Sequence, residues 1–287
     1  MPVWLLLSLS AALLWAISPL LAKKGFVHIS SLWTNIFANL FILILWVPVA
    51  LVLSHGQIHI PTIPVVFIMI VAESAYMFFF YAIAKADISL TSPLTALYPI
   101  SAVILSYIFL HERITFVETI GIGIALGGVL LIALPRKNLG KVLHQKNKSW
   151  LWWGLFSATM SGGGDFLSKY ASNSIGSYSQ IFYVALIAQG LSVINYMLDT
   201  KGRRLPEFSI GSYLPTLLGT AFSVLGMLFF FLAYRYQKAS LVVPVSSVYP
   251  ALVVIGAAIF LGEKITKRQS IGVLLITCGV MFIGFGG

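Results

Sequence analysis

The chain contains an internal repeat, which constrains its fold more than any other feature. The segment that begins at Phe78 returns 151 residues later, from Phe229, and the two copies align without a gap. Chance similarity between two apolar stretches would match Leu with Ile or Val. Here polar and conformationally special residues match in one register: Tyr98-Pro99 with Tyr249-Pro250, Glu112 with Glu263, Thr115 with Thr266, and Gly121 and Gly128 with Gly272 and Gly279. A duplicated helical bundle in a membrane is typical of transporters, because two related halves can rock around a site between them.

The composition predicts a protein that is dissolved in lipid. Apolar residues make up 59% of the chain and charged residues only 9%, whereas about a quarter of the residues are charged in a soluble domain. The net charge of +10 would favour nucleic acid in a soluble protein. The basic residues lie in loops between apolar runs, where they are an orientation signal, so we expect no nucleic-acid partner.

The reactive residue types are few and scattered. The single cysteine, Cys278, excludes an intrachain disulfide and a cysteine-based metal site. We therefore predict no metal and no cofactor. The eight acidic residues are spread thinly over the chain, which argues against a membrane-embedded enzyme, so no catalytic residue is assigned.

Ten apolar segments are long enough to cross a bilayer, which takes roughly 20 residues in a helix. They lie near 3–22, 31–53, 64–84, 89–110, 116–134, 150–170, 178–198, 211–233, 240–261 and 268–285. The polar stretch 136–149 is predicted to be a basic linker between a first repeat, residues 1–135, and a second, residues 150–287. Because five helices per repeat is an odd number, the second repeat must be inverted. We therefore expect an all-α integral membrane protein with ten transmembrane helices in two inverted five-helix repeats.

Several helix starts and one packing surface are visible in the sequence. Thr115 with Glu118, Thr266 with Gln269 and Ser177 with Gln180 have the spacing of capping boxes, in which the two side chains satisfy free amide groups. Glu112 and Glu263 precede the first two of these boxes, and we interpret them as helix-start electrostatics. The four matched glycines form small-residue stripes on the fifth and tenth spans, which predicts close helix packing.

The distribution of basic residues predicts an orientation. The loops on the side of the two termini hold four of them, Arg113, Lys169, Arg235 and Lys238, and the opposite loops hold the other fourteen. Since loops rich in Lys and Arg stay in the cytoplasm, this count places both termini outside.

The motifs of the repeat indicate a family. The residues concerned are Ser89-Leu90-Thr91-Ser92-Pro93 and Phe109-Leu110-His111-Glu112-Arg113, with their counterparts Ala239–Pro244 and Phe260-Leu261-Gly262-Glu263-Lys264. With ten spans, the chain resembles the EamA family of the drug/metabolite transporter superfamily over essentially its whole length. The resemblance implies a carrier of small metabolites in the cell membrane, the inner membrane in a bacterium, and often an exporter of amino acids or related compounds. It also implies that both termini lie in the cytoplasm, opposite to the basic-residue count.

Glu73 is the sharpest candidate for a functional residue. It lies near the middle of the third span, where an ionised carboxylate costs about 2.5–3.5 kcal/mol or more, so it should face the interior of the bundle. There it could carry protons or recognise a substrate amine. The alternative is a permanently protonated carboxyl that is hydrogen-bonded to Ser74 or Tyr76. Its repeat counterpart is Val224, so this acid belongs to one half only.

Asp165 follows three glycines, Gly162, Gly163 and Gly164, in the sixth span. Glycine costs a helix about 1 kcal/mol relative to alanine, so local unwinding is expected, and an unwound helix could expose backbone groups to substrate. Two alternatives are that the glycines allow close helix packing and that Asp165 forms an i, i+4 ion pair with Lys169.

The Tyr-Pro pairs lie in the middle of the fourth and ninth spans. Pro99 and Pro250 each remove an amide donor and free a carbonyl group, which predicts kinks that act as hinges. Tyr98 and Tyr249 would then line a central cavity, and the alternative is kinked packing only. Tyr76 and Trp15 are further candidates for substrate contact.

These features favour a secondary active transporter that works by alternating access. The substrate is predicted to be a small polar metabolite such as an amino acid or amine, with export as the direction and protons as a coupling ion. The alternative is a flippase for a lipid or lipid-linked sugar on the same fold. The expected partners are the substrate and the bilayer, and the protein should be a monomer or a weak dimer.

Overall fold

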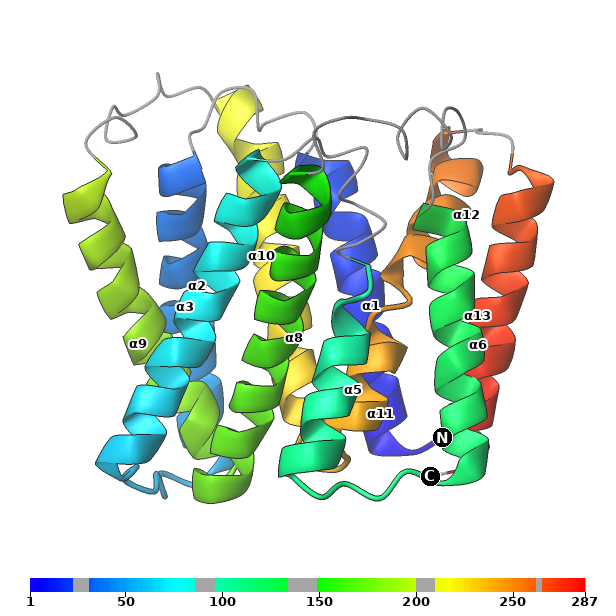
Figure 1. Ribbon diagram of the computed structural model, residues 1–287. Coiled ribbons are helices and arrows are strands. Elements are labelled where there is room, and N and C mark those ends of the chain that lie inside the picture. The colour runs from blue at the N-terminus through cyan, green and yellow to red at the C-terminus, as the bar shows by residue number, and fades with distance from the viewer. Residues whose placement is uncertain (23–30, 86–95, 134–148, 200–209, 262–264, 287) are drawn as a thin grey trace.

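The computed structural model describes residues 1–22, 31–85, 96–133, 149–199, 210–261 and 265–286, and within these residues it is helical without strands. The helices run roughly parallel in one bundle (Figure 1). Those of the first half are α1 (Val3–Ala22), α2 (Ser31–Leu53), α3 (Ile63–Lys85), α5 (Tyr98–Phe109) and α6 (Phe116–Ala133). Those of the second half are α8 (Ser149–Ile175), α9 (Ser177–Leu198), α10 (Ile210–Ala233), α11 (Ala239–Ser246), α12 (Tyr249–Leu261) and α13 (Lys267–Gly286).

The ten predicted spans correspond to these helices one by one. Five described stretches are long and apolar enough to cross a membrane, in α2, α9, α10, α11–α12 and α13. Four shorter apolar helices, α1, α3, α5 and α6, match the spans predicted in the first half. The sixth span is α8. The N- and C-termini lie at the same end of the bundle, as an even number of spans requires (Figure 1); we call this end the termini face.

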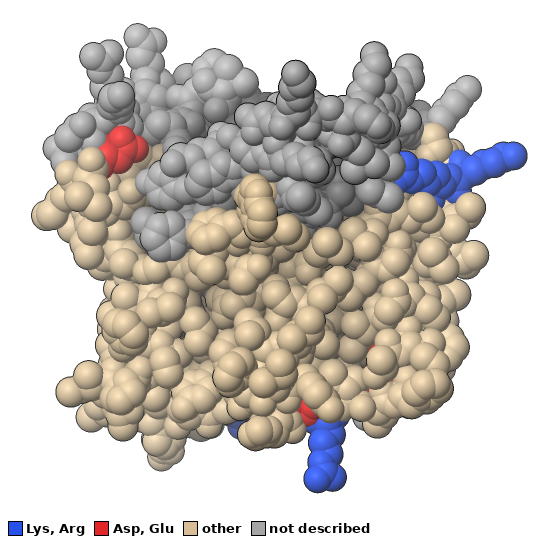
Figure 2. All heavy atoms as spheres, in the orientation of Figure 1, with Lys and Arg blue, Asp and Glu red and all other residues tan. Residues whose placement is uncertain are grey.

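The outer surface has the character of a lipid-facing one. Large apolar side chains are exposed on many helices, among them Ile44, Phe67 and Leu274. The lysines and arginines that are visible in Figure 2 lie at the two ends of the molecule, and the surface between them is almost entirely uncharged. Because a soluble protein rarely exposes contiguous apolar patches of this kind, the middle of the bundle fits the hydrocarbon layer.

The two halves interlock instead of lying side by side. The most extensive helix contacts join α6 to α13, α1 to α10, α3 to α8 and α2 to α9. Each of these pairs takes one helix from each half. The hydrophobic core is therefore shared, and neither half buries its apolar faces alone.

The predicted glycine stripes face one another across the contact between α6 and α13. A Cβ atom at Gly121 would lie 2.8 Å from the carbonyl oxygen of Gly279, and one at Gly128 would lie 2.7 Å from that of Gly272. The expected close packing is thus confirmed. In the repeat, Gly121 corresponds to Gly272 and Gly128 to Gly279, so the two contacts are equivalent. A pseudo-two-fold axis therefore passes between α6 and α13.

Two of the three predicted capping boxes are confirmed. The carboxylate of Glu118 accepts a hydrogen bond from the amide of Thr115, and the Thr115 hydroxyl accepts one from the amide of Glu118. Thr266 and Gln269 make the same reciprocal pair.

The third predicted capping box, Ser177 with Gln180, is wrong. The N-cap of α9 is Gly176, whose φ of 82° is one that glycine adopts readily, so the helix already includes Ser177. The hydroxyl of Ser177 pairs with that of Ser172 at 2.7 Å instead. The buried amide atoms of Gln180 have no hydrogen-bond partner among the described residues.

Substitution of the contact glycines should destabilise the protein. Gly121→Ala should lower its free energy of unfolding by about 1–3 kcal/mol, because the new methyl group meets the backbone of α13, which cannot move aside freely. Gly123 is a matched control on the same helix, since a Cβ there meets nothing within 4 Å. Gly123→Ala should keep or raise the melting temperature in detergent, because alanine favours the helix by about 0.5–1 kcal/mol. Equal melting temperatures for the two variants would contradict the packing described here.

Candidate functional site

Both Tyr-Pro pairs lie at the start of a helix in the middle of a span. In the ninth span, α11 ends at Ser246 and α12 begins at Tyr249, with a turn between them. In the fourth span, α5 begins at Tyr98, and Pro99 occupies its first turn. The first turn of a helix tolerates proline because its amide groups have no partner within the helix. The ninth span is therefore two helices, a sharper interruption than the predicted kink.

Four of the predicted site residues lie together at these interruptions. Asp165 and Tyr249 are within electrostatic range of Tyr98. Trp15 packs edge-on against Tyr249, with ring centroids 6.5 Å apart and an interplanar angle of 86°. We call Trp15, Tyr98, Asp165 and Tyr249 the central cluster. It draws on α1, α5, α8 and α12, two helices from each half.

Asp165 is the buried acid of the central cluster, with 4% of its surface exposed. The hydroxyl of Tyr234 donates a hydrogen bond to its backbone carbonyl at 3.3 Å. Tyr234 was not predicted as a site residue. The only signal for it is that its counterpart in the repeat is Ile83, so it is one of the positions where the copies differ.

The predicted partner of Asp165, Lys169, extends toward the end of α10. Its ammonium group donates hydrogen bonds to the carbonyl oxygens of Tyr234 and Gln237. These are carbonyl groups at a helix C-terminus, where a cation is favoured. Lys169 thereby ties α8 to the chain that follows α10.

The glycines before Asp165 do not unwind α8, so this expectation is wrong. The helix is continuous from Ser149 to Ile175. A Cβ at Gly162 would collide with the hydroxyl of Ser101 and the carbonyl of Tyr98, whereas one at Gly163 meets nothing within 4 Å. Gly162 therefore allows α8 to cross the first turn of α5, as the packing alternative proposed. Gly164 is buried in the same helix.

Glu73 lies apart from the central cluster. It is 8% exposed in the middle of α3, and one of its carboxyl oxygens has no hydrogen-bond partner among the described residues. The suggested partner Ser74 donates instead to the carbonyl of Ile70, at 2.7 Å. The side chain of Tyr76 lies outside the described residues, so its part in a site stays a prediction.

Trp15 combines a structural contact with its place in the central cluster. Its indole nitrogen donates a hydrogen bond to the carbonyl of Ser223 on α10, at 3.2 Å. A Cβ at Gly226 would lie 2.9 Å from the indole ring, so this glycine makes room for the tryptophan. The ring is thereby fixed in position next to Tyr249.

A polar pocket of about 470 Å³ opens on the termini face. We call it the termini-face pocket. Its lining consists of polar residues and one glycine from the ends of α8, α9 and α10 and the segments beside them: Glu112, Lys169, Ser172, Asn173, Gly176, Ser177, Tyr234, Arg235, Tyr236, Gln237 and Lys238. Because Tyr234 lines the pocket and also contacts Asp165, it connects the pocket to the central cluster.

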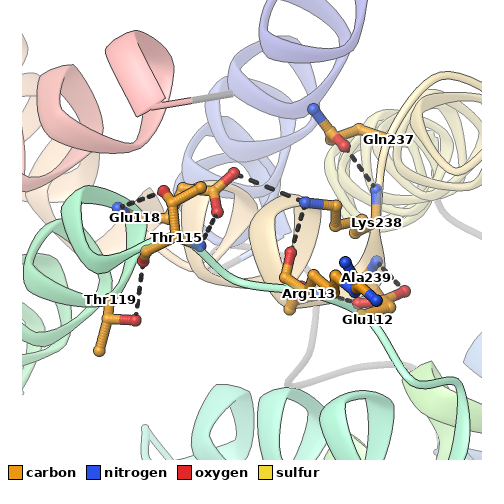
Figure 3. Close-up of polar contacts among 9 residues, drawn as sticks. Glu112, Arg113, Thr115, Glu118, Thr119, Gln237, Lys238 and Ala239 are labelled. Atoms are coloured by element: carbon orange, nitrogen blue, oxygen red, sulfur yellow. Dashed lines mark hydrogen bonds and ion pairs between the residues drawn. The ribbon is translucent and has the colours of Figure 1, made fainter.

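Glu112 caps a helix of the other half. Its two carboxylate oxygens accept hydrogen bonds from the amides of Ala239 and Ser240, at 3.0 and 2.9 Å, in the first turn of α11 (Figure 3). Glu112 thus serves a helix start, as predicted, but that of α11 and not that of α6, which follows it in the chain. Glu263 lies outside the described residues.

Lys238 joins the same two segments. Its ammonium donates to the carbonyl of Arg113 at 2.6 Å and lies 3.7 Å from the carboxylate of Glu118 (Figure 3). The segment between α5 and α6 is therefore linked to the start of α11 at the termini face. These contacts join polar groups of both halves at the edge of the termini-face pocket.

Comparison with known proteins decides the family. A model of the EamA-like transporter family matches the chain twice, over residues 2–134 and 148–285. The chain belongs to the EamA-like transporter family. The predicted membership, and with it that of the drug/metabolite transporter superfamily, is confirmed.

Relatives of this EamA protein carry equally general names. An uncharacterized transporter of Archaeoglobus fulgidus is 24% identical over 97% of both chains. The uncharacterized transporter YetK of Bacillus subtilis is 30% identical over 42% of this chain and 39% of its own. An uncharacterized protein of Methanocaldococcus jannaschii is 30% identical over 45% of this chain and 92% of its own length.

A crystal structure of a protein with 15% sequence identity superposes with a TM-score of 0.77 and covers 98% of this chain and 96% of its own. At this identity the likeness concerns the fold alone. Together with the family, it identifies a multi-pass membrane protein with an EamA-type fold and a small-molecule substrate.

Proposed function

We propose that this EamA protein is a secondary active transporter that exports a small polar metabolite of the amine or amino-acid class by alternating access. The observation that carries the proposal is the central cluster. Aromatic faces attract cations, and a buried carboxylate favours a charged partner. Tyr98 lies within electrostatic range of both Asp165 and Tyr249, and Trp15 packs against Tyr249. This combination of a buried acid with aromatic rings suits a protonated amine. The outward direction is what the family resemblance implies.

The position of the central cluster supports alternating access. Each half contributes two of its residues, so a relative movement of the halves would change the access to it. The interruption between Ser246 and Tyr249 and the helix start at Tyr98 are the points where such a movement can bend the chain. Pro99 and Pro250 remain the proposed hinges.

The termini-face pocket supports a soluble substrate over a lipid. Its lining residues are polar apart from one glycine, and an aqueous solute needs such a lining to replace its hydration. A flippase would need an apolar groove that opens sideways to the bilayer. The termini-face pocket has a polar lining instead.

Glu73 is our candidate for proton coupling. A buried carboxyl at mid-depth of α3, with one oxygen unpaired among the described residues, can bind a proton in one arrangement of the halves and release it in another. Its absence from the second half supports a role in coupling instead of in the symmetric framework.

The role of Asp165 is tested by transport in proteoliposomes. A panel of amines, amino acids, sugars and nucleosides should identify an amine-bearing substrate for the wild-type protein. Asp165→Asn should reduce its transport at least about tenfold, a loss of roughly 1.4 kcal/mol or more in binding. Asp199→Asn, at the end of α9, is the matched control and should retain transport. Transport by Asp165→Asn at the wild-type rate would refute the proposed site.

The role of Glu73 is tested with the same substrate and an imposed pH gradient. The gradient should accelerate transport by the wild-type protein and by Asp199→Asn. Glu73→Gln cannot release a proton, so we expect it to bind substrate and to exchange it without any response to the gradient. If Glu73→Gln still responds to the gradient as the wild type does, Glu73 is not the coupling residue.

A further inference from the structure

The termini-face pocket carries an excess of positive charge. Three cations line it, Lys169, Arg235 and Lys238, against one acid, Glu112. Both oxygens of Glu112 already accept hydrogen bonds from the first turn of α11. Lys238 has a counter-charge in Glu118. Glu112 keeps its negative charge and lies within electrostatic range of Lys169. One positive charge is therefore left in excess at the pocket, and it is available to a ligand.

Lys169 is built into the wall of the pocket. It is 6% exposed, and its ammonium is held by the carbonyl oxygens of Tyr234 and Gln237. An ammonium has three N–H donors, so two such bonds leave one for a ligand. A lysine fixed in this way loses little conformational entropy when it binds an anion.

Arg235 is positioned by aromatic rings at the entrance of the pocket. Its guanidinium lies over the ring of Tyr178, 4.5 Å from the centroid, and near Tyr236 at 6.0 Å. The stacked guanidinium keeps its planar set of N–H donors, which matches the two oxygens of a carboxylate or phosphate group.

The start of α9 adds a further positive potential. Gly176 and Ser177 line the pocket, and α9 begins there with no side-chain cap. The free amide groups at the N-terminus of a 22-residue helix favour a negative charge. Lys169 on α8, the start of α9 and Arg235 after α10 favour the same kind of ligand.

We infer that the termini-face pocket binds an anionic group, a carboxylate or a phosphate, of the transported molecule. The inference rests on the proposed function and narrows its substrate class. Among amine-bearing compounds it selects those that also carry an acid, such as amino acids, over simple amines. Tyr234 lies between this pocket and the carboxylate-bearing central cluster, so the two groups of one molecule can be recognised in succession.

The test is anion binding to the purified full-length protein in detergent. Acetate and inorganic phosphate are titrated separately against chloride at constant ionic strength, and the melting temperature is recorded. At least one of the two anions should raise the melting temperature in a saturable manner. The difference between acetate and phosphate shows whether the pocket prefers a carboxylate or a phosphate group. Lys169→Gln should weaken the apparent affinity at least about tenfold. Lys267→Gln, an exposed lysine at the start of α13, is the matched control and should bind as the wild type does.

Arg235→Gln provides a second variant whose side chain is exposed, so the test does not depend on the stability of Lys169→Gln. It should also weaken the saturable shift. No saturable shift with either anion, or equal affinity in wild type, Arg235→Gln and Lys267→Gln, would overturn the inference. In that case transport that still depends on Asp165 would leave the proposed function intact.

Discussion

The backbone contact between α6 and α13 determines how the two halves are placed. Glycine at positions 121, 128, 272 and 279 lets the two backbones approach closely, and the carbonyl oxygen of each glycine meets a glycine of the other half. The contact is antiparallel and symmetric, so it defines the pseudo-two-fold axis of the molecule. The Tyr-Pro pairs of the fourth and ninth spans are related by the same axis, which brings Tyr98 and Tyr249 into one region.

The repeat builds a symmetric framework, and we propose that the residues that differ between its copies bind the substrate and the coupling proton. The first span matches the sixth at an offset of 146 residues, which pairs Trp4 with Trp150 and Lys23 with Lys169. At this offset Asp165 corresponds to Pro19, and at the offset of 151 Tyr234 corresponds to Ile83. Val224, the counterpart of Glu73, lies in the core, and its carbonyl accepts a hydrogen bond from the indole of Trp46 at 3.3 Å. The same position therefore holds a packing residue in one half and a buried acid in the other. A carrier needs equivalent halves to move and unequal ones to recognise an asymmetric solute.

The fold could be predicted from the sequence because its signals are local. Apolar length determines the spans, the odd number of spans per half determines the inversion, and the Thr115–Glu118 and Thr266–Gln269 boxes mark helix starts within four residues. The motifs shared by the two repeats then indicated the superfamily. Each of these signals can be recognised in the sequence without knowledge of the tertiary contacts.

The predictions that failed, and the residues that were missed, depend on tertiary contacts. Gly162 looked like a point of unwinding, and only the crossing of α5 shows that it is a contact residue. Ser177 has the spacing of a cap but lies inside α9, since the turn at Gly176 starts the helix earlier. The carbonyl groups that accept hydrogen bonds from Lys169 lie 65 and 68 residues further along the chain. No local sequence pattern could therefore predict that Lys169 lines a pocket with Arg235.

Access to the central cluster from both sides of the membrane tests the account most directly. With the single cysteine removed by Cys278→Ser, Tyr98→Cys and Tyr249→Cys each place one thiol at the cluster. A membrane-impermeant thiol reagent is then applied to right-side-out and to inside-out vesicles. The account predicts that both positions react from both sides, since each opens to either face in turn. Reaction from one side only, or from neither, would contradict it.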